Sequence, residues 1–417
     1  MKFALLLFFL LVTTGELALS WLNLQHLKRH GREVPRGFEG SLDPETLQKT
    51  VDYTVENNRL GLIETLCGTI LVVLFLFCGI LDRYDHWVVS HSNAFVLQGL
   101  LFFLPLCLLQ SILDIPFSLY ENFSIEKRYG FNTMPPSLWL TDFIKSTLLS
   151  ILLITLVIAG AFTLVQMSPH GWWLWVWGLL ALLSLAMLYL SPYLIEPLFF
   201  HFEPIQSEGL QMEIQLLMKR AGLEVRRVLQ VDASRRSTHS NAYFTGIGKV
   251  KRIVLFDTLI ERLDTREILA VLAHEAGHWK AHHLLKRLIA TELVILVACY
   301  GAFVVLERNA LPPLFGMATV SFPAQLVLLG FILSLVATFF APISAWFSRR
   351  HEREADRFAA DLTGTPEALA SSLVKMGRDN LANLHPHPLY AALHYSHPPL
   401  TERVQTLLAR KELQSEN

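Results

Sequence analysis

Charged residues are scarce in this chain of 417 residues. Asp, Glu, Lys and Arg make up 17% of it, whereas hydrophobic residues make up 52%. Soluble domains carry about 25% charged residues, so the composition does not fit a purely cytosolic enzyme, and it excludes a disordered chain. An excess of either charge is also lacking, because 35 basic residues stand against 36 acidic ones. We therefore expect no nucleic acid as a partner.

Cysteines are equally rare, and no two of them have the spacing of a metal-binding or redox site. The chain has four cysteines, Cys67, Cys78, Cys107 and Cys299, and each lies in an apolar run. Without a CxxC pair they indicate neither a zinc knuckle nor a redox site. We expect them to be small buried apolar residues. Internal repeats and low-complexity segments are absent as well.

Long apolar runs are the main feature that is present. A bilayer core of about 30 Å needs about 20 mostly apolar helical residues. Seven stretches qualify: 3–22, 62–81, 94–119, 146–166, 172–199, 287–306 and 323–347. Pro105 and Pro116 predict kinks in the third, and the fifth opens with an aromatic belt typical of a membrane interface, Trp172 to Trp177.

The first stretch has two interpretations. Lys2, the apolar core that follows it and Ala18-Leu19-Ser20 together resemble a signal peptide with a cleavage site. With seven spans and the N-terminus outside, however, 32 of the 35 Lys and Arg residues fall on one side. Basic residues favour the cytoplasmic side, and cleavage near residue 20 would export six of them. We therefore expect a retained first span and an outside N-terminus.

Two portions of the chain are not membrane-like. The sequence divides into helices 1–5 with their loops (1–200), a polar portion (201–284), helices 6–7 (285–347) and a C-terminal polar portion (348–417). Both polar portions fall on the basic, cytoplasmic side. Because two spans separate them, a site that uses both must be assembled in space.

The first polar portion contains HEAGHW at residues 274–279. Asp264 to Glu267 upstream predict a capping box, so a helix should begin near Thr265. Residues four apart share a helix face, and His274 and His278 can therefore bind one Zn²⁺ through their imidazoles. Glu275 beside them can take a proton from a metal-bound water. The alternatives are a polar surface turn, or His278 and His282 as the ligand pair. We expect His282 and the His283 that follows it to lie instead on a wet helix end near the membrane.

A catalytic zinc usually has three protein ligands, so one more must come from elsewhere. The sequence SRRHEREAD, residues 348–356, follows the seventh span directly. If that helix continues, Glu352 and Asp356 share a face and Glu354 points away. Glu352 is then the favoured third ligand, with Asp356 as a partner of a ligating histidine. His351 is a rival ligand, and a solvated ladder of Arg and Glu remains an alternative.

These motifs resemble the type I CAAX prenyl endopeptidases, integral-membrane zinc metalloproteases. Three further segments match that family in the same order: IEKRYGFN (125–132), RSTHSNAY (236–243) and YSHPPLTER (395–403). The resemblance implies a mainly α fold, with seven transmembrane helices enclosing a chamber and a small α+β zinc metalloprotease portion. The absence of long insertions and of an extended C-terminal tail suggests a bacterial member, in the inner membrane.

The resemblance also implies roles for single residues and a cofactor, one Zn²⁺ per chain. His274, His278 and Glu352 are the expected ligands, with Asp356 orienting a histidine. Glu275 is the expected general base, and His397 stabilises the oxyanion. Asn241 and Ala242 bind the substrate as an edge strand, and Arg403, near the site, is also expected to bind substrate. Alone, Asn241 would be a turn residue, His397 a loop histidine and Arg403 a surface charge.

The expected function is zinc-dependent endoproteolysis in a membrane. The resemblance implies a peptide or protein substrate, prenylated or membrane-associated, like those from which the family removes a C-terminal tripeptide. Membrane lipid is the second expected partner, and in a bacterium the role would be quality control of membrane proteins. Two other classes stay open at this point: a transporter or channel, and a non-catalytic scaffold for membrane proteins.

Overall fold

Seven long helices form most of the molecule. The computed structural model describes residues 1–245 and 251–415, and seven of its helices are long and apolar enough to cross a membrane. They are α1 (Lys2–His30), α2 with the π-helical turn η1 (Pro44–Val72, Val73–Phe77), α4 with η2 (Phe95–Tyr120, Glu121–Glu126), α5 (Pro136–Met167), α6 with η3 and α7 (Trp172–Leu190, Ser191–Ile195, Glu196–Phe199), α11 (His283–Glu307) and α13 (Phe322–Thr363). The predicted number of spans is confirmed.

The ends of these helices differ from the predicted ones for identifiable reasons. The second span ends at Phe77 rather than at 81, because Gly79 adopts a positive φ of 82° and a separate helix, α3 (Ile80–His91), follows. At the other extreme, α13 continues to Thr363 and ends at Gly364, which has a φ of 69°. An apolar window detects only the part of a helix that suits lipid, so it missed the charged continuation.

The prediction that the cysteines are buried is wrong. Cys78 is exposed, the other three are only partly buried, and all four are free thiols. Apolar side chains on membrane helices can face lipid instead of protein, so an apolar run does not guarantee burial inside the chain.

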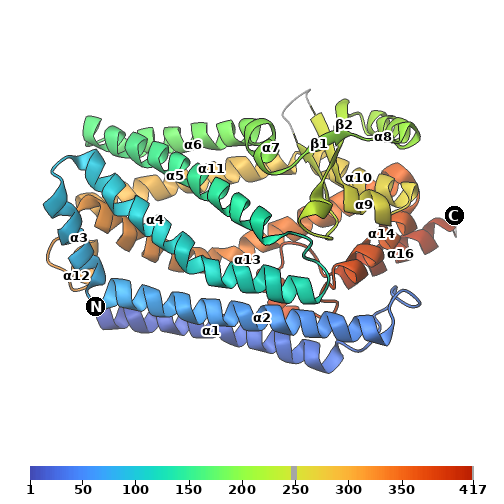
Figure 1. The fold of residues 1–417 in the computed structure, drawn as a ribbon, viewed down its shortest axis with the longest axis horizontal. Helices are drawn as coiled ribbons and strands as arrows, with labels where there is room; N and C mark the ends of the chain where they lie inside the picture. Colours follow the sequence, from blue (N-terminus) through green and yellow to red (C-terminus); the bar gives the residue numbers. More distant parts are fainter. Residues whose placement is uncertain (246–250, 416–417) are drawn as a thin grey trace.

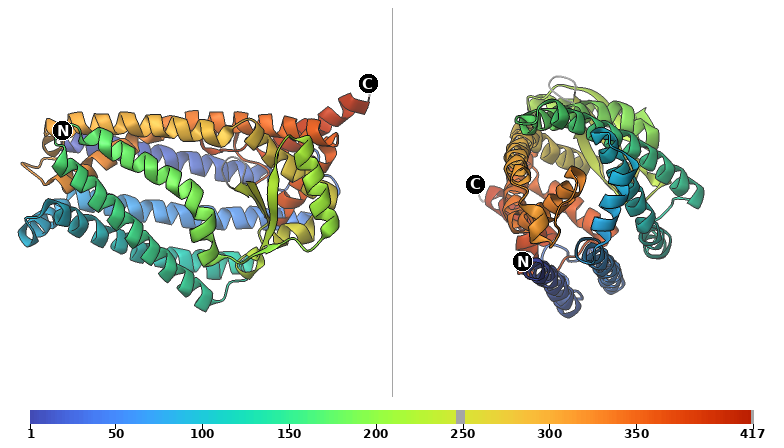
Figure 2. Two further views of the ribbon diagram at one scale, coloured as in Figure 1. Left: turned by 90° about the horizontal axis from the view of Figure 1, so that it is seen from above. Right: turned by 90° about the vertical axis from the view of Figure 1, so that its left-hand side faces the viewer.

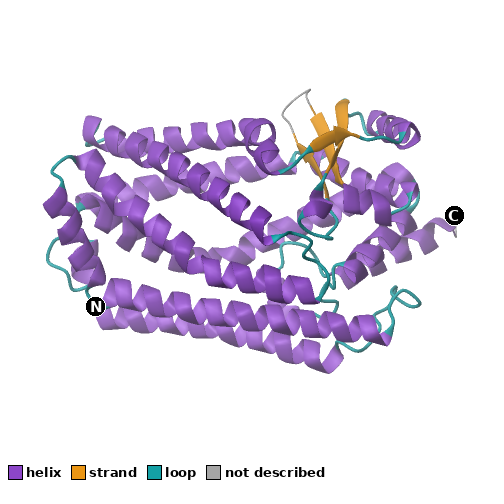
Figure 3. Ribbon diagram, in the orientation of Figure 1, coloured by secondary structure: helices purple, strands orange, loops and turns teal. Residues whose placement is uncertain are grey.

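The helices run side by side along the molecule, and all the strands gather at one end (Figure 1 and Figure 3). In the end view of Figure 2 the helices are set around a common centre. The N-terminus lies at the opposite end, together with α3 and the short helix α12 (Leu311–Leu314). The chain therefore carries its polar portions at one end of the helical bundle.

The sheet has four strands in the order β1-β2-β4-β3. They are β1 (Phe202–Pro204), β2 (Val225–Val231), β3 (Ala242–Thr245) and β4 (Lys251–Phe256). β2 and β4 are parallel, whereas the other two pairs are antiparallel. Since β3 pairs with β4 alone among the described residues, it is an edge strand.

One hydrophobic core joins the two polar portions. It contains Ile253 and Leu255 of β4, Leu272 of α10 and Leu369 from the C-terminal portion, all almost fully buried. The helices around it are α8 (Glu208–Arg220), α9 (Asp257–Arg262), α10 (Thr265–Lys280), α14 (Pro366–Asp379) and α16 (Leu400–Ser415). The short helix α15 (Pro388–His394) packs against α13. The portions are thus assembled in space across the α11–α13 pair, while the predicted division into four portions stays a prediction.

Candidate metal centre

Helix α10 begins with the predicted capping box. Asp264 accepts a hydrogen bond from the backbone N–H of Glu267 at 3.0 Å, and the Glu267 carboxylate accepts from the Asp264 N–H at 2.9 Å. Glu267 is buried and also accepts from Lys375 of α14 at 2.7 Å. The cap therefore defines where α10 starts and anchors that end to α14.

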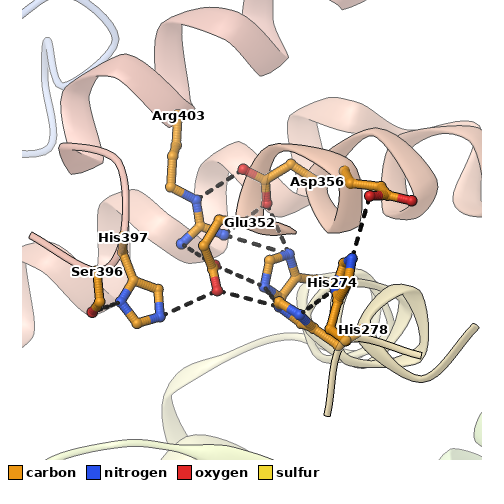
Figure 4. A network of polar contacts seen from close by, with 9 residues as sticks. His274, His278, Glu352, Asp356, Ser396, His397 and Arg403 are labelled. Carbon is orange, nitrogen blue, oxygen red and sulfur yellow. Dashed lines mark hydrogen bonds and ion pairs between the residues drawn. The ribbon is translucent and has the colours of Figure 1, made fainter. Parts of the chain in front are cut away.

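About two turns after Glu267, α10 presents its two histidines to α13. The Nε2 atoms of His274 and His278 lie 3.2 Å apart. Glu352 of α13 meets both: Oε2 lies 3.4 Å from His274 Nε2, and Oε1 lies 3.3 Å from His278 Nε2 (Figure 4). All three donor atoms fall within 4.8 Å of one another.

This donor set fits a zinc ion. Metal bonds of about 2.1 Å in a tetrahedral site separate neighbouring ligand atoms by about 3.4 Å. The two Nε2 atoms lie 3.2 Å apart, and each lies 3.3–3.4 Å from its nearer oxygen of Glu352. Oε2 of Glu352 is buried without a hydrogen-bond partner in the structure. Such a group is costly, and a cation between the three donors would satisfy it. The two imidazoles and one carboxylate are also ligand types that zinc prefers.

Gly277 allows the two helices to come this close. A Cβ atom at this position would lie 3.0 Å from Ala355 Cα and 3.2 Å from its carbonyl oxygen, on α13. Gly277 precedes His278, and Ala355 lies between Glu352 and Asp356. The short contact therefore brings the third donor to the histidine pair.

Glu275 follows His274 on α10 and is not one of the three donors. Burial raises the pKa of its carboxyl, while the nearby histidines lower it. A carboxyl with a raised pKa is suited to accept and return a proton near neutral pH.

Asp356 and Arg403 hold the far side of His274. His274 Nδ1 lies 2.8 Å from Asp356 Oδ1, so it can donate there while Nε2 faces the centre. Arg403 of α16 donates two hydrogen bonds to the same carboxylate, at 2.9 Å and 2.7 Å. The guanidinium thus fixes Asp356. A contact of Arg403 with substrate stays a prediction.

His397 approaches the centre from the loop before α16. Its Nε2 lies 3.4 Å from Glu352 Oε1, and 63% of its side chain is exposed. Its Nδ1 lies 3.0 Å from the hydroxyl of Ser396 (Figure 4). An accessible ring nitrogen beside the donor set can reach a bound substrate.

Asn241 and Ala242 lie at the start of the edge strand. Ala242 is buried and pairs with Leu255, and the carbonyl of Asn241, an exposed residue, accepts from the N–H of Phe256 at 3.1 Å. Since β3 also packs against α10, the strand lies beside the histidine helix. The substrate role of both residues stays a prediction.

The loop at 125–132 contacts the segment that leads into β3. Asn132 forms a bridge with Ser237, and the N–H of Thr238 donates to the carbonyl of Phe131 at 3.0 Å. The His239 ring stacks on Phe131 at 4.3 Å. Two of the motifs that resembled the family therefore form one contact between the membrane helices and the sheet.

The expectation of a wet helix end at His282 and His283 is wrong for His283. Its ring is 2% exposed and contacts both His278 and Glu354, whereas His282 is exposed. His351 stacks on His283 at 4.0 Å and is not among the three grouped donors. Sequence reasoning missed His283 and Glu354, and five-residue spacing from His278 was the only available signal.

The fold and the site together define a class: a multi-pass membrane metalloendopeptidase. Residues 204–411 match the model of peptidase family M48, and residues 23–201 match that of the CAAX prenyl protease N-terminal domain with five membrane helices. The chain belongs to family M48. This membership supports the protease hypothesis over a transporter, a channel or a non-catalytic scaffold.

Relatives of this family resemble the chain over nearly its whole length. A CAAX prenyl protease 1 homolog of Arabidopsis thaliana is 34% identical over 90% of each chain. CAAX prenyl protease 1 of Saccharomyces cerevisiae is 30% identical, over 92% of this chain and 90% of its own. The crystal structure of S. mikatae Ste24p matches with a TM-score of 0.90 and 28% identity, over 97% of this chain and 98% of that one.

Proposed function

We propose that this chain is a zinc endopeptidase that cleaves near the C-terminus of membrane-associated CAAX-type proteins. The observation that carries the proposal is the group formed by His274, His278 and Glu352. The two Nε2 atoms lie 3.2 Å apart, and each lies 3.3–3.4 Å from one of the two oxygens of Glu352. The names of the relatives, CAAX prenyl proteases, supply the substrate class.

The residues of the site divide the chemistry between them. When bound, zinc polarises the scissile carbonyl and lowers the pKa of its water. Glu275 accepts the proton of the attacking water and passes it to the leaving amine. With Ser396 donating to Nδ1 of His397, the proton of that ring is on Nε2, where it can donate to the developing oxyanion.

The substrate is held in an extended form beside the metal centre. An exposed strand edge binds a peptide through main-chain hydrogen bonds, and Asn241 and Ala242 begin such an edge. The helices around the common centre of Figure 2 are proposed to enclose a chamber for the lipid-bearing end of the substrate.

The proposal is tested with purified protein and a pair of peptides. A farnesylated C-terminal peptide and the same peptide without its prenyl group are incubated with wild type, with and without a zinc chelator. We expect one zinc per chain and chelator-sensitive cleavage that prefers the farnesylated peptide. Equal cleavage of both would reject the prenyl preference, and zinc-loaded protein that cleaves neither would reject the substrate class.

The proposed orientation places the N-terminus outside and the metal centre on the cytoplasmic side. Its support is the sorting of basic residues, 32 of 35 on the side of the polar portions. The bacterial inner membrane stays a prediction.

A further inference from the structure

The second nitrogen of each histidine in the centre has a partner outside it. For His274 that partner is Asp356. For His278, Nε2 faces Glu352 and His274, so Nδ1 points away from the centre, where it meets Nδ1 of His283 at 3.0 Å. His283 is the first residue of α11 and is 2% exposed. Its other nitrogen, Nε2, lies 3.3 Å from Oε2 of Glu354.

The positions of the protons follow from these contacts. A ring nitrogen that binds a metal offers its lone pair, so the proton of a neutral His278 is on Nδ1. That N–H can donate to His283 only if Nδ1 of His283 is unprotonated. A neutral His283 then carries its proton on Nε2 and donates it to the Glu354 carboxylate. Every donor in the chain of contacts therefore has an acceptor.

We propose that His283 and Glu354 are positioning residues that fix the orientation and tautomer of His278. They form a carboxylate–histidine relay that parallels the role of Asp356 at His274. The relay joins α10, α11 and α13, and the His351 ring, stacked on His283 at 4.0 Å and 15°, restrains the middle member. The inference rests on the proposed metal binding by His278.

Two substitutions of His283 separate its hydrogen bond from its bulk. His283→Leu removes the acceptor, whereas His283→Asn keeps a carbonyl oxygen near the position of Nδ1. The control is His282→Asn, because the neighbouring histidine is exposed and has a positive φ of 55°, which Asn tolerates. Zinc affinity is measured by chelator competition on the full-length protein, and ligand geometry by the visible spectrum of the cobalt-substituted form.

Loss of an outer partner of a metal-binding histidine typically weakens metal affinity about 10–100-fold. We expect that loss and an altered cobalt spectrum for His283→Leu, substantial recovery for His283→Asn and no change for His282→Asn. Glu354→Leu should lose less zinc affinity than His283→Leu but more than His282→Asn, because water can replace its half-exposed carboxylate. Wild-type affinity in His283→Leu, or equal losses in both His283 variants, would overturn the relay. A wild-type protein that binds no zinc would instead reject the proposed function.

Discussion

At the residue scale, Glu275 lies on the histidine helix without belonging to the donor group. Glu275→Gln keeps the size of the side chain but cannot accept a proton. We expect it to retain its zinc and to lose about 10²–10⁴-fold in turnover, the usual contribution of a general base. Metal analysis and peptide cleavage on the same preparation measure both. Normal turnover would contradict the mechanism, and the inactive variant would serve to trap natural substrates.

Glu352→Ala tests a metal ligand instead of the general base, so here the zinc itself should be lost. It removes the donor that joins α13 to the histidine pair and leaves Glu275 in place. We expect a zinc content well below one per chain after dialysis, with activity restored only in excess zinc. Arg350→Ala is the control, because that residue is exposed on α13 and lies outside the donor group. A full zinc equivalent in Glu352→Ala would remove Glu352 from the ligand set.

His239 lies away from the metal centre, and its protonation should make the stability of the fold depend on pH. Its hydrogen bond with Glu126, at 3.2 Å, raises the pKa of the imidazole, and burial opposes that rise less strongly. Asn380 bonds the ring as well, and Arg262 opposes its charge. Because the pKa of His239 is raised in the folded state, the stabilisation that the charged imidazole gains from Glu126 is fully present below its unfolded-state pKa of about 6.5. It is lost as the pH rises through the folded-state pKa.

We therefore expect the Tm advantage of wild type over His239→Gln to be largest near pH 6 and to shrink toward pH 9. Thermal unfolding in detergent across that range measures it. His86→Gln, at a side chain 78% exposed, should show no such trend. An advantage that grows with pH would contradict the assigned charge.

At the element scale, the crossing of α10 and α13 determines whether the donor group exists. Gly277→Ala inserts a methyl group about 3.0 Å from the α13 backbone. Overpacking of this kind costs about 1–3 kcal/mol, and it should push Glu352 away from the histidines. We expect lower thermal stability together with weaker zinc binding. Gly209→Ala on α8 is the control, since a Cβ there meets nothing within 4 Å. Unchanged zinc affinity in Gly277→Ala would show that the contact can relax.

The elements also show what sequence reasoning can reach. Helical periodicity alone placed His274 and His278 on one face, and a capping box located the start of α10. The long apolar runs predicted the seven spans. Those features are local, so a pattern along the chain contains them.

Contacts between distant segments were harder to predict. The third donor could be ranked only by assuming that α13 continues past residue 347. Residue chemistry then favoured Glu352 over His351, and the family resemblance strengthened that choice. His283 and Glu354 were missed because their contact depends on how α11 and α13 approach each other. Such contacts are properties of packing, and a single sequence contains no periodic signal for them.

At the scale of the whole molecule, the sorting of charge predicts the direction in which the protein is inserted. The loop 168–171 joins α5 to α6 at the end opposite the sheet, and His170 there is 95% exposed. Met212, on α8 beside the sheet, is 64% exposed. Single cysteines at these two positions therefore report on opposite sides of the membrane.

We expect a membrane-impermeant maleimide to label His170→Cys in intact cells, and Met212→Cys only after the cells are opened. The background carries Cys78→Ser, because Cys78 is an exposed native thiol, and the unsubstituted background is the control for the remaining cysteines. Thirty-two basic residues would have to cross the membrane for the reverse orientation, which the positive-inside rule disfavours. Labelling of Met212→Cys in intact cells would therefore place the metal centre outside and would reject the proposed orientation.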